Sequence, residues 1–228
     1  KDLTSKIKDA SIYYRNEVLN LLEGNVDIKS LVVSKTLKTG YIDPTKITHK
    51  VLAERIRERD PGNAPTSNDR IPYVFIDPSE LKCSVCNKKV SVDNCKCRRC
   101  MKLYCSHHIN KHSDICEYKC RICWTTGDSK RNIIECGGEC KGCYCLKHRS
   151  THKCQKITNK ILQGDLVETP SFITKNNIKV NYRYYLDKQI RIPIEQIFNL
   201  LDEKNILKDI IRKNDNNRNK VRNITDFF

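Results

Sequence analysis

The hydrophobic pattern predicts a helical chain with a few short strands. Between residues 4 and 23, apolar side chains recur at helical spacing, and Gly24 follows as a natural stop. A short extended piece is expected at residues 28–33 and a short strand at residues 71–76. Between them, Asp43-Pro44 resembles an N-cap followed by proline at the first helical position. We therefore expect a helix to begin there and to end before Pro61-Gly62.

This second helix is expected to have one apolar and one basic face. Ile47, Val51, Leu52 and Ile56 share the apolar face. The basic side chains on the other face and at the helix end are Lys46, Lys50, Arg55, Arg57 and Arg59. Such a face can bind phosphates, or it can be a solvated surface that pairs with Glu54 and Glu58.

The last third of the chain predicts a further helix and then a polar segment. Helical spacing begins near residue 181, continues through Pro193, and includes Ile194, Ile197, Phe198 and Leu201. Residues 213–220 are polar and rich in asparagine, a composition typical of disorder. A final apolar cluster follows at residues 224–228.

Residues 83–154 interrupt this pattern with all fourteen cysteines and five of the six histidines. The block contains one pattern twice: two cysteine pairs, then Tyr-Cys-x2-His-x3-His, then a last cysteine. Tyr104-Cys105 aligns with Tyr144-Cys145. Such self-similarity indicates a duplicated unit.

Each copy offers eight ligands, enough for two tetrahedral sites. Thiolate and imidazole together suit zinc, and four protein ligands per ion leave no open position for a reacting water. Four successive ligand pairs usually interleave, which predicts about four structural zinc ions. The predicted sets are Cys83, Cys86, Cys105 and His108; Cys97, Cys100, His112 and Cys116; Cys120, Cys123, Cys145 and His148; and Cys136, Cys140, His152 and Cys154. Cys95, Cys143 and His107 are left over, and any of them could replace a neighbour.

Two other cysteine chemistries are possible. An even number of cysteines could form disulfides, but the Cys-x2-Cys pairs and interspersed histidines favour metal. An iron–sulfur cluster usually takes four cysteines without histidine. The order and spacing resemble the B-box zinc domain, which has a RING-like cross-brace fold and implies protein interaction rather than catalysis.

Composition favours a polyanionic partner. The formal net charge is +16, which suits nucleic acid, although a coding bias toward lysine and asparagine could also produce it. No apolar run approaches the roughly 18 residues of a membrane span. The cysteine usage implies a reducing intracellular compartment. The chain begins at a lysine and has Met101 as its only methionine, so we expect it to be part of a longer polypeptide.

Three segments before the cysteine block carry a family resemblance. Residues 31–37 (LVVSKTL), 48–65 (THKVLAERIRERDPGNAP) and 69–74 (DRIPYV) resemble the thumb of family B DNA polymerases, closest to the delta-like replicative enzymes of eukaryotes and large DNA viruses. After the block, residues 164–170 (GDLVETP) and 181–190 (NYRYYLDKQI) resume that resemblance. The block therefore interrupts a thumb, and it is tolerable if it projects from a surface loop whose ends stay close.

The resemblance implies a mainly helical thumb that grips primer–template duplex DNA behind the active site. Its expected parts are residues 1–78 and 159–212, two cross-brace zinc modules at 79–117 and 118–158, and a flexible tail at 213–228. No catalytic residue is expected here, because the palm motifs that hold magnesium are missing from these residues. The parent polypeptide would be a nucleotidyltransferase of the nucleus or of a viral replication factory. The basic residues expected near DNA are Lys35, Lys46, Lys50, Arg55, Arg57, Arg59, Arg70 and Lys188.

The last residues resemble the peptide motif that binds a PCNA-like sliding clamp. Ile224 would be the aliphatic anchor and Phe227 and Phe228 the aromatic ones, with Val221 where glutamine is usual. A chain end that folds back onto the thumb is the alternative. In the cellular enzymes, cysteine modules follow the thumb instead of interrupting it, so binding of an accessory replication subunit by these modules is a weaker expectation. A different class of function is a B-box or RING-like interaction adaptor with a basic helical extension.

Overall fold

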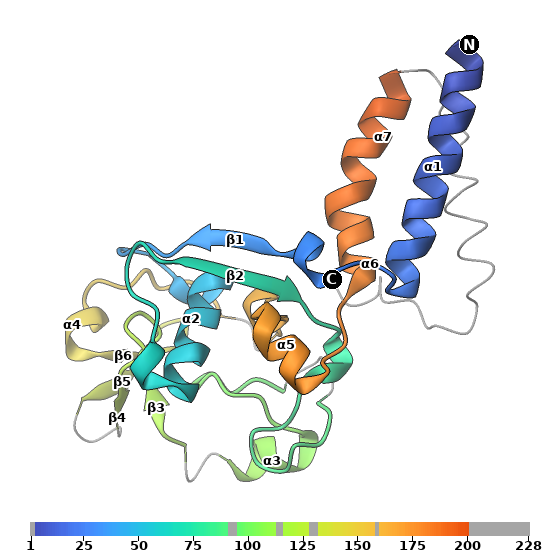
Figure 1. The fold of residues 1–228 in the computed structure, drawn as a ribbon. Coiled ribbons are helices and arrows are strands. Elements are labelled where there is room, and N and C mark those ends of the chain that lie inside the picture. The colour runs from blue at the N-terminus through green and yellow to red at the C-terminus, as the bar shows by residue number, and fades with distance from the viewer. Residues whose placement is uncertain (1–2, 91–94, 113–115, 128–131, 158–159, 201–228) are drawn as a thin grey trace. The chain divides into compact units, whose positions relative to one another are not determined.

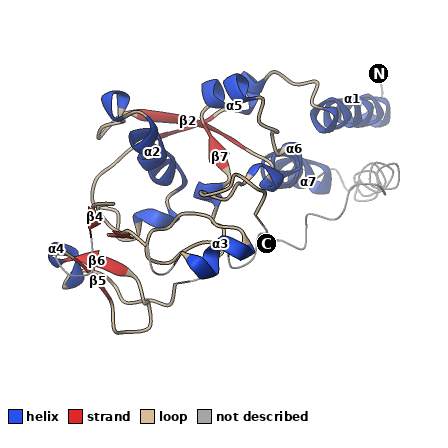
Figure 2. Cartoon of the chain, turned by 90° about the horizontal axis from the view of Figure 1, so that it is seen from below, coloured by secondary structure: helices blue, strands red, loops and turns tan. Residues whose placement is uncertain are grey.

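The computed structural model describes residues 3–90, 95–112, 116–127, 132–157 and 160–200 (Figure 1). The chain divides into two compact units. Of the described residues, one unit contains those up to Leu31 together with those from Asn181 to Leu200, and the other contains those within Val32–Val180. The cysteine block therefore shares a unit with the segments on either side of it. Helices and small antiparallel sheets make up both the cysteine block and the rest of its unit, which we call the body (Figure 2).

The first unit is a helical pair. Helix α1 (Leu3–Glu23) buries Tyr14, Val18 and Leu21 on one face, as the hydrophobic spacing predicts. Gly24 ends it in the left-handed region, with φ of +79°, and a Cβ there would lie 3.2 Å from the Tyr182 ring. Helix α1 packs against α6 (Tyr182–Tyr185) and against the π-helical turn that follows α6 (Leu186–Ile190).

Helix α7 (Arg191–Leu200) continues from that π-helical turn and contains Pro193, as the sequence predicts. Proline has no N–H to donate and its ring collides with the carbonyl four residues earlier. A π turn immediately before such a proline lets the helix continue, because it changes the local hydrogen-bond register.

The body of the second unit is a three-stranded antiparallel sheet with helices around it. Strand β2 (Arg70–Phe75) lies in the middle, between β1 (Val33–Thr36) and β7 (Val167–Glu168). Val74 and Val167 are fully buried in its core, together with Leu52 of α2 (Thr48–Arg59). Short 3₁₀ turns at Ile28–Leu31, Pro61–Asn63, Pro78–Glu80 and Gln163–Asp165 connect the elements of the chain.

Helix α2 begins later than the sequence predicts. Asp43 does act as a cap, but it caps a separate 3₁₀ turn at Pro44–Lys46. The α-helical ladder starts only where the Val51 N–H donates to the Ile47 carbonyl. The extended piece expected at 28–33 is likewise a 3₁₀ turn followed by strand β1.

Three short helices were not predicted, two within the cysteine block and a longer one after it. Helix α5 (Pro170–Asn176) begins at Thr169, whose side chain accepts a hydrogen bond from the Phe172 N–H, and it ends at Asn177 in the left-handed region. The signals for this helix, threonine followed by proline, were present in the sequence. They lay within the segment that carried the family resemblance, and the helix is only two turns long.

Strands β2 and β7 pair across the cysteine block. Val74 and Phe75 lie opposite Glu168 and Val167, and the Ile76 N–H donates to the Leu166 carbonyl at 2.9 Å. The two ends of the insertion are therefore close, as a tolerated insertion requires.

The block has its own small elements. The first module contains α3 (Ser106–Lys111). The second contains the hairpins β3 (Tyr118–Lys119) with β4 (Thr126–Gly127) and β5 (Ile133–Glu135) with β6 (Cys143–Cys145), followed by α4 (Leu146–Arg149).

The sequence suggested an insertion that projects from a surface loop. In the structure, the block also contacts the body of its unit. The Lys96 ammonium contacts both Asp165 carboxylate oxygens, at 2.8 and 2.7 Å, and Lys119 pairs with Glu58 of α2. Arg121 donates to the Thr45 hydroxyl at 2.9 Å. These polar contacts seat both modules against the body. The described helices include none with the length and apolar character to cross a membrane.

Candidate metal centres and basic surface

Four tight turns shape the cysteine pairs. The residue after the second cysteine of each pair has a left-handed backbone; these residues are Asn87, Met101, Trp124 and Lys141. In the first three turns its N–H donates to the carbonyl of the first cysteine, at 2.9–3.0 Å. The N–H of the first cysteine in turn donates to a carbonyl five residues on, or six in the longer fourth turn. This backbone points both thiols of a pair toward one point.

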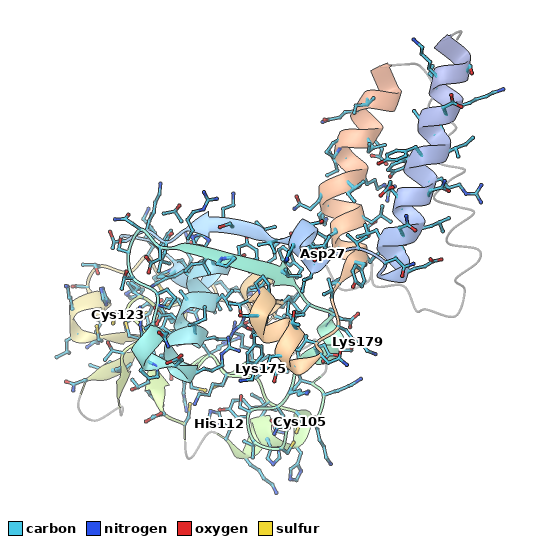
Figure 3. The ribbon with its side chains drawn as sticks, viewed as in Figure 1. Asp27, Cys105, His112, Cys123, Lys175 and Lys179 are labelled. Atoms are coloured by element: carbon cyan, nitrogen blue, oxygen red, sulfur yellow. The ribbon has the colours of Figure 1, made fainter. Side chains whose placement is uncertain are left out.

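The structure brings together the four sets of side chains that the interleaved pairing predicts. In each set the four candidate ligand atoms all lie within 4.8 Å of one another. Figure 3 labels Cys105 and His112 at the two ends of α3, where they belong to different sets, and Cys123 in the second module. One short helix thus supplies ligands to two sites.

The distances within these sets fit a tetrahedral metal. The Sγ atoms of Cys86 and Cys105 are 3.9 Å apart, and those of Cys97 and Cys116 are 3.7 Å apart. The two corresponding pairs in the second module are both 3.8 Å apart. A tetrahedron with Zn–S bonds of about 2.3 Å has edges of about 3.8 Å, whereas a disulfide brings its sulfurs to about 2.05 Å. The described cysteines are all free thiols.

The histidines face their sites through different ring nitrogens. His108 and His148 point Nδ1 at the sulfurs, at 3.3 Å from Cys105 and 3.2 Å from Cys145. His112 and His152 point Nε2, and the other ring nitrogen of His152 lies 2.7 Å from the Arg149 carbonyl. With Nε2 facing the site, Nδ1 carries the proton and donates it to that carbonyl, which fixes the tautomer and the ring orientation.

The two tyrosines of the repeated Tyr-Cys pair occupy equivalent places. Tyr104 stacks on His112 with ring centroids 4.0 Å apart, and Tyr144 stacks on His152 at 3.9 Å. Each hydroxyl also lies near a sulfur of the same set, 3.4 Å from Cys100 and 3.8 Å from Cys140. Burial first, and the neighbouring sulfur second, raise the pKa of both tyrosines, so each stays a hydrogen-bond donor.

The thiols of the first module differ in acidity. Burial raises the pKa of Cys83, but main-chain N–H groups of Cys105, Cys86 and Val85 outweigh it and lower the pKa to about 6. The hydrogen bond with Cys97 and burial raise the pKa of Cys100 to about 12. A metal ion would have to displace the protons of the less acidic thiols, so its binding depends on pH.

The three left-over residues take other places. Cys143 is fully buried in a small apolar cluster with Cys120 and Ile133, and burial raises the pKa of its thiol to about 12. Cys95 is also buried, and its carbonyl accepts from the Tyr104 N–H. His107 is exposed and its ring lies edge-on to that of His108. None of the three joins a described set of candidate ligands.

The three arginines of α2 are held by the body rather than directed freely to solvent. Arg55 donates to the carbonyls of Asp165 and Val167. Arg59 pairs with Glu168 of β7 at 2.9 Å and lies 3.9 Å over the Phe172 ring.

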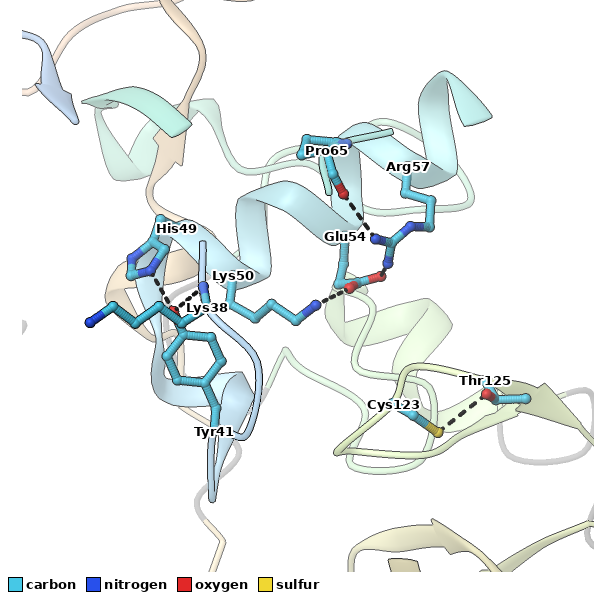
Figure 4. Close-up of polar contacts among 9 residues, drawn as sticks. All are labelled: Lys38, Tyr41, His49, Lys50, Glu54, Arg57, Pro65, Cys123 and Thr125. Atoms are coloured by element: carbon cyan, nitrogen blue, oxygen red, sulfur yellow. Dashed lines mark hydrogen bonds and ion pairs between the residues drawn. The ribbon is translucent and has the colours of Figure 1, made fainter. Parts of the chain in front are cut away.

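The third arginine, Arg57, binds Glu54 and the Pro65 carbonyl, as Figure 4 shows. Glu54 is buried and also binds Lys50 at 2.7 Å. The partners of Arg55 and Arg59 lie about 110 residues away in sequence, so local charge pattern could not reveal them. Of the other basic residues expected near DNA, Lys35, Lys46, Arg70 and Lys188 are exposed.

The fold and the cysteine sets together define a class of protein: a helix-and-sheet framework into which two modules are inserted, each with two sets of side chains that could hold a metal ion. The sequence model for DNA polymerase family B matches residues 1–201. The chain belongs to DNA polymerase family B. The match spans both sides of the cysteine block, as the family resemblance predicts.

Individual relatives agree with this assignment. The chain is 30% identical to a DNA polymerase of Acanthamoeba polyphaga mimivirus over 202 residues, which is 88% of this chain and 7% of that protein. It is 28% identical to a DNA polymerase of Pyramimonas orientalis virus over 188 residues, which is 82% of this chain and 9% of that protein. A DNA polymerase delta catalytic subunit of Oryza sativa is 48% identical over 65 residues, or 28% of this chain and 6% of that protein. The chain thus spans less than a tenth of the viral relatives it matches.

Proposed function

We propose that this chain is the thumb and C-terminal region of a replicative DNA-directed DNA polymerase, and that it grips the primer–template duplex. The family match over residues 1–201 carries the proposal, and the names of the viral and delta-type relatives support it. Nucleotide transfer, with its magnesium ions, would take place on palm carboxylates elsewhere in the longer polypeptide.

In this proposal the grip depends on the exposed basic residues more than on the arginines of α2. Arg55 and Arg59 already bind carbonyls and Glu168, so they would act by fixing the shape of the body. Lys35 of β1 and Arg70 of β2 are exposed on neighbouring strands, and the Arg70 side chain donates a 3.2 Å hydrogen bond to the Ser34 hydroxyl. Such side chains can neutralise phosphates without reading bases.

The test of the grip is the salt dependence of duplex binding. Binding of the zinc-loaded chain to a labelled primer–template should weaken steeply and without sequence preference as salt rises, because counterions are released. Replacing Lys35 and Arg70 with alanine should reduce the slope of log K against log salt by about 1.8, or about 0.9 for each phosphate that the variant no longer neutralises. Lys175→Ala, at an exposed lysine on α5, is the matched control. An unchanged slope in the double variant would place the grip elsewhere, for example at Lys188.

The zinc modules are proposed to be structural. Four protein ligands per set and sulfur separations near 3.8 Å support zinc with no open coordination position. Elemental analysis of the purified chain should find about four zinc ions per chain and little iron, from the four sets of four ligands. Stoichiometric iron with visible absorbance would reject zinc.

The tail at residues 221–228 is proposed to bind a PCNA-like sliding clamp, with Ile224, Phe227 and Phe228 as anchors; these residues lie outside the described part of the structure. Buried aromatic anchors usually dominate such interfaces. A peptide of residues 214–228 should bind the clamp of the same organism, and replacing both phenylalanines with alanine should abolish binding. Clamp-dependent processivity that survives in the double variant would contradict this role.

A zinc-dependent interaction adaptor is the competing function. An adaptor would not need family B sequence on both sides of its zinc block, and this chain has it. The pairing of β2 with β7 across the block also argues against an independent adaptor, because each side needs the other to complete the sheet. Binding of an accessory replication subunit by the modules remains part of the proposal.

A further inference from the structure

Three cationic side chains of the cysteine block contact the body, and their partners differ. Lys96 contacts both oxygens of Asp165, and Lys119 pairs with Glu58. Arg121 is buried, with 7% of its surface exposed, yet its contact with the body is the neutral Thr45 hydroxyl at 2.9 Å. Within the described part of the chain, no carboxylate forms an ion pair with Arg121. A buried charge without a counter-ion is unfavourable, so this guanidinium is available to bind an anion.

Arg121 lines a cavity between the second module and the turn that precedes α2. The cavity has a volume of about 150 Å³, and its other cationic lining residues are Lys46, Lys153 and Lys156. The one carboxylate in its wall is Asp43. That carboxylate is engaged by the Thr45 hydroxyl at 2.5 Å and by Lys46 at 3.6 Å. The cavity therefore carries a net positive charge.

Another part of the wall is apolar. Ile122, Ile157 and Leu162 line the cavity, and Ile42, which is 66% exposed, also contributes. Gly142 lies close by, and a Cβ there would come within 2.8 Å of the Arg121 Cδ and 2.9 Å of the Ile157 Cδ1. This close packing holds the arginine stem in place, so the site is preformed around its guanidinium.

Size and lining together decide the kind of ligand. Pockets for nucleotides and drug-sized molecules usually occupy about 300–1,000 Å³, so this cavity is too small for one and has room for one or two side chains. A duplex phosphate would use the lysines but would leave the apolar half of the wall without a partner. An acidic side chain next to an aliphatic or aromatic one satisfies both halves. Arginine and aromatic side chains in such pockets are frequent energetic centres of protein interfaces.

We infer that this cavity is a docking site for a partner protein, and that it takes a peptide segment with an acidic residue beside an apolar one. The partner's carboxylate would complete the ion pair that Arg121 lacks, and the neighbouring side chain would cover Ile122, Ile157 and Leu162. This inference rests on the proposed zinc-held fold of the second module, since Tyr144 and His152 also line the cavity.

The test measures binding of a fluorescein-labelled peptide, Gly-Asp-Leu-Asp-Phe-Gly, to the zinc-loaded 228-residue chain by fluorescence anisotropy. The peptide should bind, whereas Gly-Asn-Leu-Asn-Phe-Gly and Gly-Asp-Ser-Asp-Ser-Gly should bind at least ten times more weakly. Lys46→Glu combined with Lys156→Glu should weaken binding at least tenfold. Lys175→Glu, at an exposed lysine outside the cavity, is the matched control.

Arg121→Met separates docking from a purely structural role. Replacing a buried unpaired charge with an apolar side chain of similar length is often neutral or stabilising, so the variant should unfold at the same or a higher temperature while losing the peptide. A lower melting temperature with unchanged peptide binding would overturn the inference.

Two further outcomes would also overturn it. One is zinc-loaded protein that binds none of the acidic peptides. The other is a primer–template that displaces the peptide and loses affinity in the same variants, because the cavity would then belong to the DNA grip. Zinc content is measured on every sample. If the purified protein contains no zinc, the proposed zinc modules are rejected rather than the docking site. The failure of one proposal can therefore be distinguished from the failure of the other.

Discussion

At the scale of single residues, the repeated tyrosine contacts the second candidate metal set of each module, and we propose that it positions the ligands there. Tyr104 and Tyr144 each combine a ring stacked on a histidine with a hydroxyl near a cysteine sulfur. Groups that orient metal ligands in this way typically affect metal affinity by about 10–100-fold. The duplication preserved this arrangement along with the ligands themselves.

Changing Tyr104 should therefore loosen the zinc without unfolding the chain. Tyr104→Phe keeps the stack on His112 but removes the hydroxyl, so zinc release to a chromogenic chelator should become a few times faster. Tyr104→Leu removes the stack as well and should accelerate release further. Tyr41→Phe, which removes a hydroxyl that contacts His49 rather than a cysteine sulfur, is the control. Equal release rates in all four proteins would show that the tyrosine only fills space.

Gly164 marks a second residue whose identity is fixed by packing. A Cβ at Gly164 would lie 2.8 Å from the Val51 Cβ, which is closer than real contacts allow. Gly164→Ala should lower the free energy of unfolding by about 1–3 kcal/mol, in line with other overpacked cores. Val51→Ala in the same chain removes the two methyl groups that the new Cβ would meet at 2.9 and 3.2 Å, so it should recover part of this loss in chemical denaturation. An additive further loss in the double variant would contradict the steric explanation.

Residue roles were predictable where they depend on neighbours in sequence. The cysteine and histidine sets follow from short spacings that fix which side chains converge, and the structure groups them accordingly. The contacts of Arg55, Arg59 and Lys96 depend on Asp165, Val167 and Glu168 from the other side of the block. No local pattern encodes such partners, so the sequence suggested only a DNA-facing or a solvated helix face.

At the scale of elements, helix α2 lies between the sheet and the cysteine modules. Its arginines bind β7 and the turn before it, and Glu58 near its end binds Lys119 of the second module. Lys50 lies 5.8 Å from the Trp124 ring centre. A change in the sheet or in the cysteine modules would therefore alter contacts of this helix. The hydrophobic spacing predicted α2 itself. It could not predict the burial of the acidic residue Glu54, which is tolerated because Lys50 and Arg57 compensate its charge.

The contact between the first module and the body should be sensitive to one lysine. In Lys96→Met, the Asp165 carboxylate stays buried without its counter-charge. Breaking a buried pair from one side typically costs about 3–5 kcal/mol, so the variant should unfold at clearly lower denaturant concentration. Lys102→Met, at an exposed lysine in the same module, should have little effect. Equal stability of the two variants would show that the module is not held by this pair.

The start of α2 should give the body a measurable pH dependence. Burial first, then the charge of Lys35, lower the pKa of His49, while a backbone hydrogen bond with Thr36 acts in the opposite direction. The folded state therefore disfavours the protonated ring. Its contribution to stability is full above the unfolded pKa of about 6.5 and is lost as pH falls below it.

His49→Gln should flatten the decline in stability between about pH 7 and pH 5, the range that brackets the unfolded pKa. Comparing it with the unchanged chain isolates the histidine from the acid sensitivity of the cysteine sets, which both proteins share. The measurement is the denaturation midpoint as a function of pH. Parallel pH profiles would exclude His49 as a source of this dependence.

At the scale of the whole molecule, the candidate metal sites and the body form one compact unit, Val32–Val180. Chelation should unfold the cysteine modules, because structural zinc supplies much of the folding free energy of such small domains. It should also remove the partners of Glu58, Thr45 and Asp165. Hydrogen exchange in α2 and β7 should therefore accelerate on chelation, whereas an insertion hanging from a loop would leave both protected. Helix α1, which belongs to the other unit, is the internal reference.

The pairing of β2 with β7 also has a kinetic consequence. The two strands lie about ninety residues apart in sequence, and the entropy lost in bringing chain ends together grows with the length of the flexible segment between them. Once the modules between Cys83 and Cys154 are compact, about twenty residues of connecting chain remain flexible, which lowers the closure cost by roughly 1.3 kcal/mol. Zinc loading before strand pairing should thus accelerate closure of the sheet about tenfold. During synthesis, the supply of metal would then determine when the strands of the body pair.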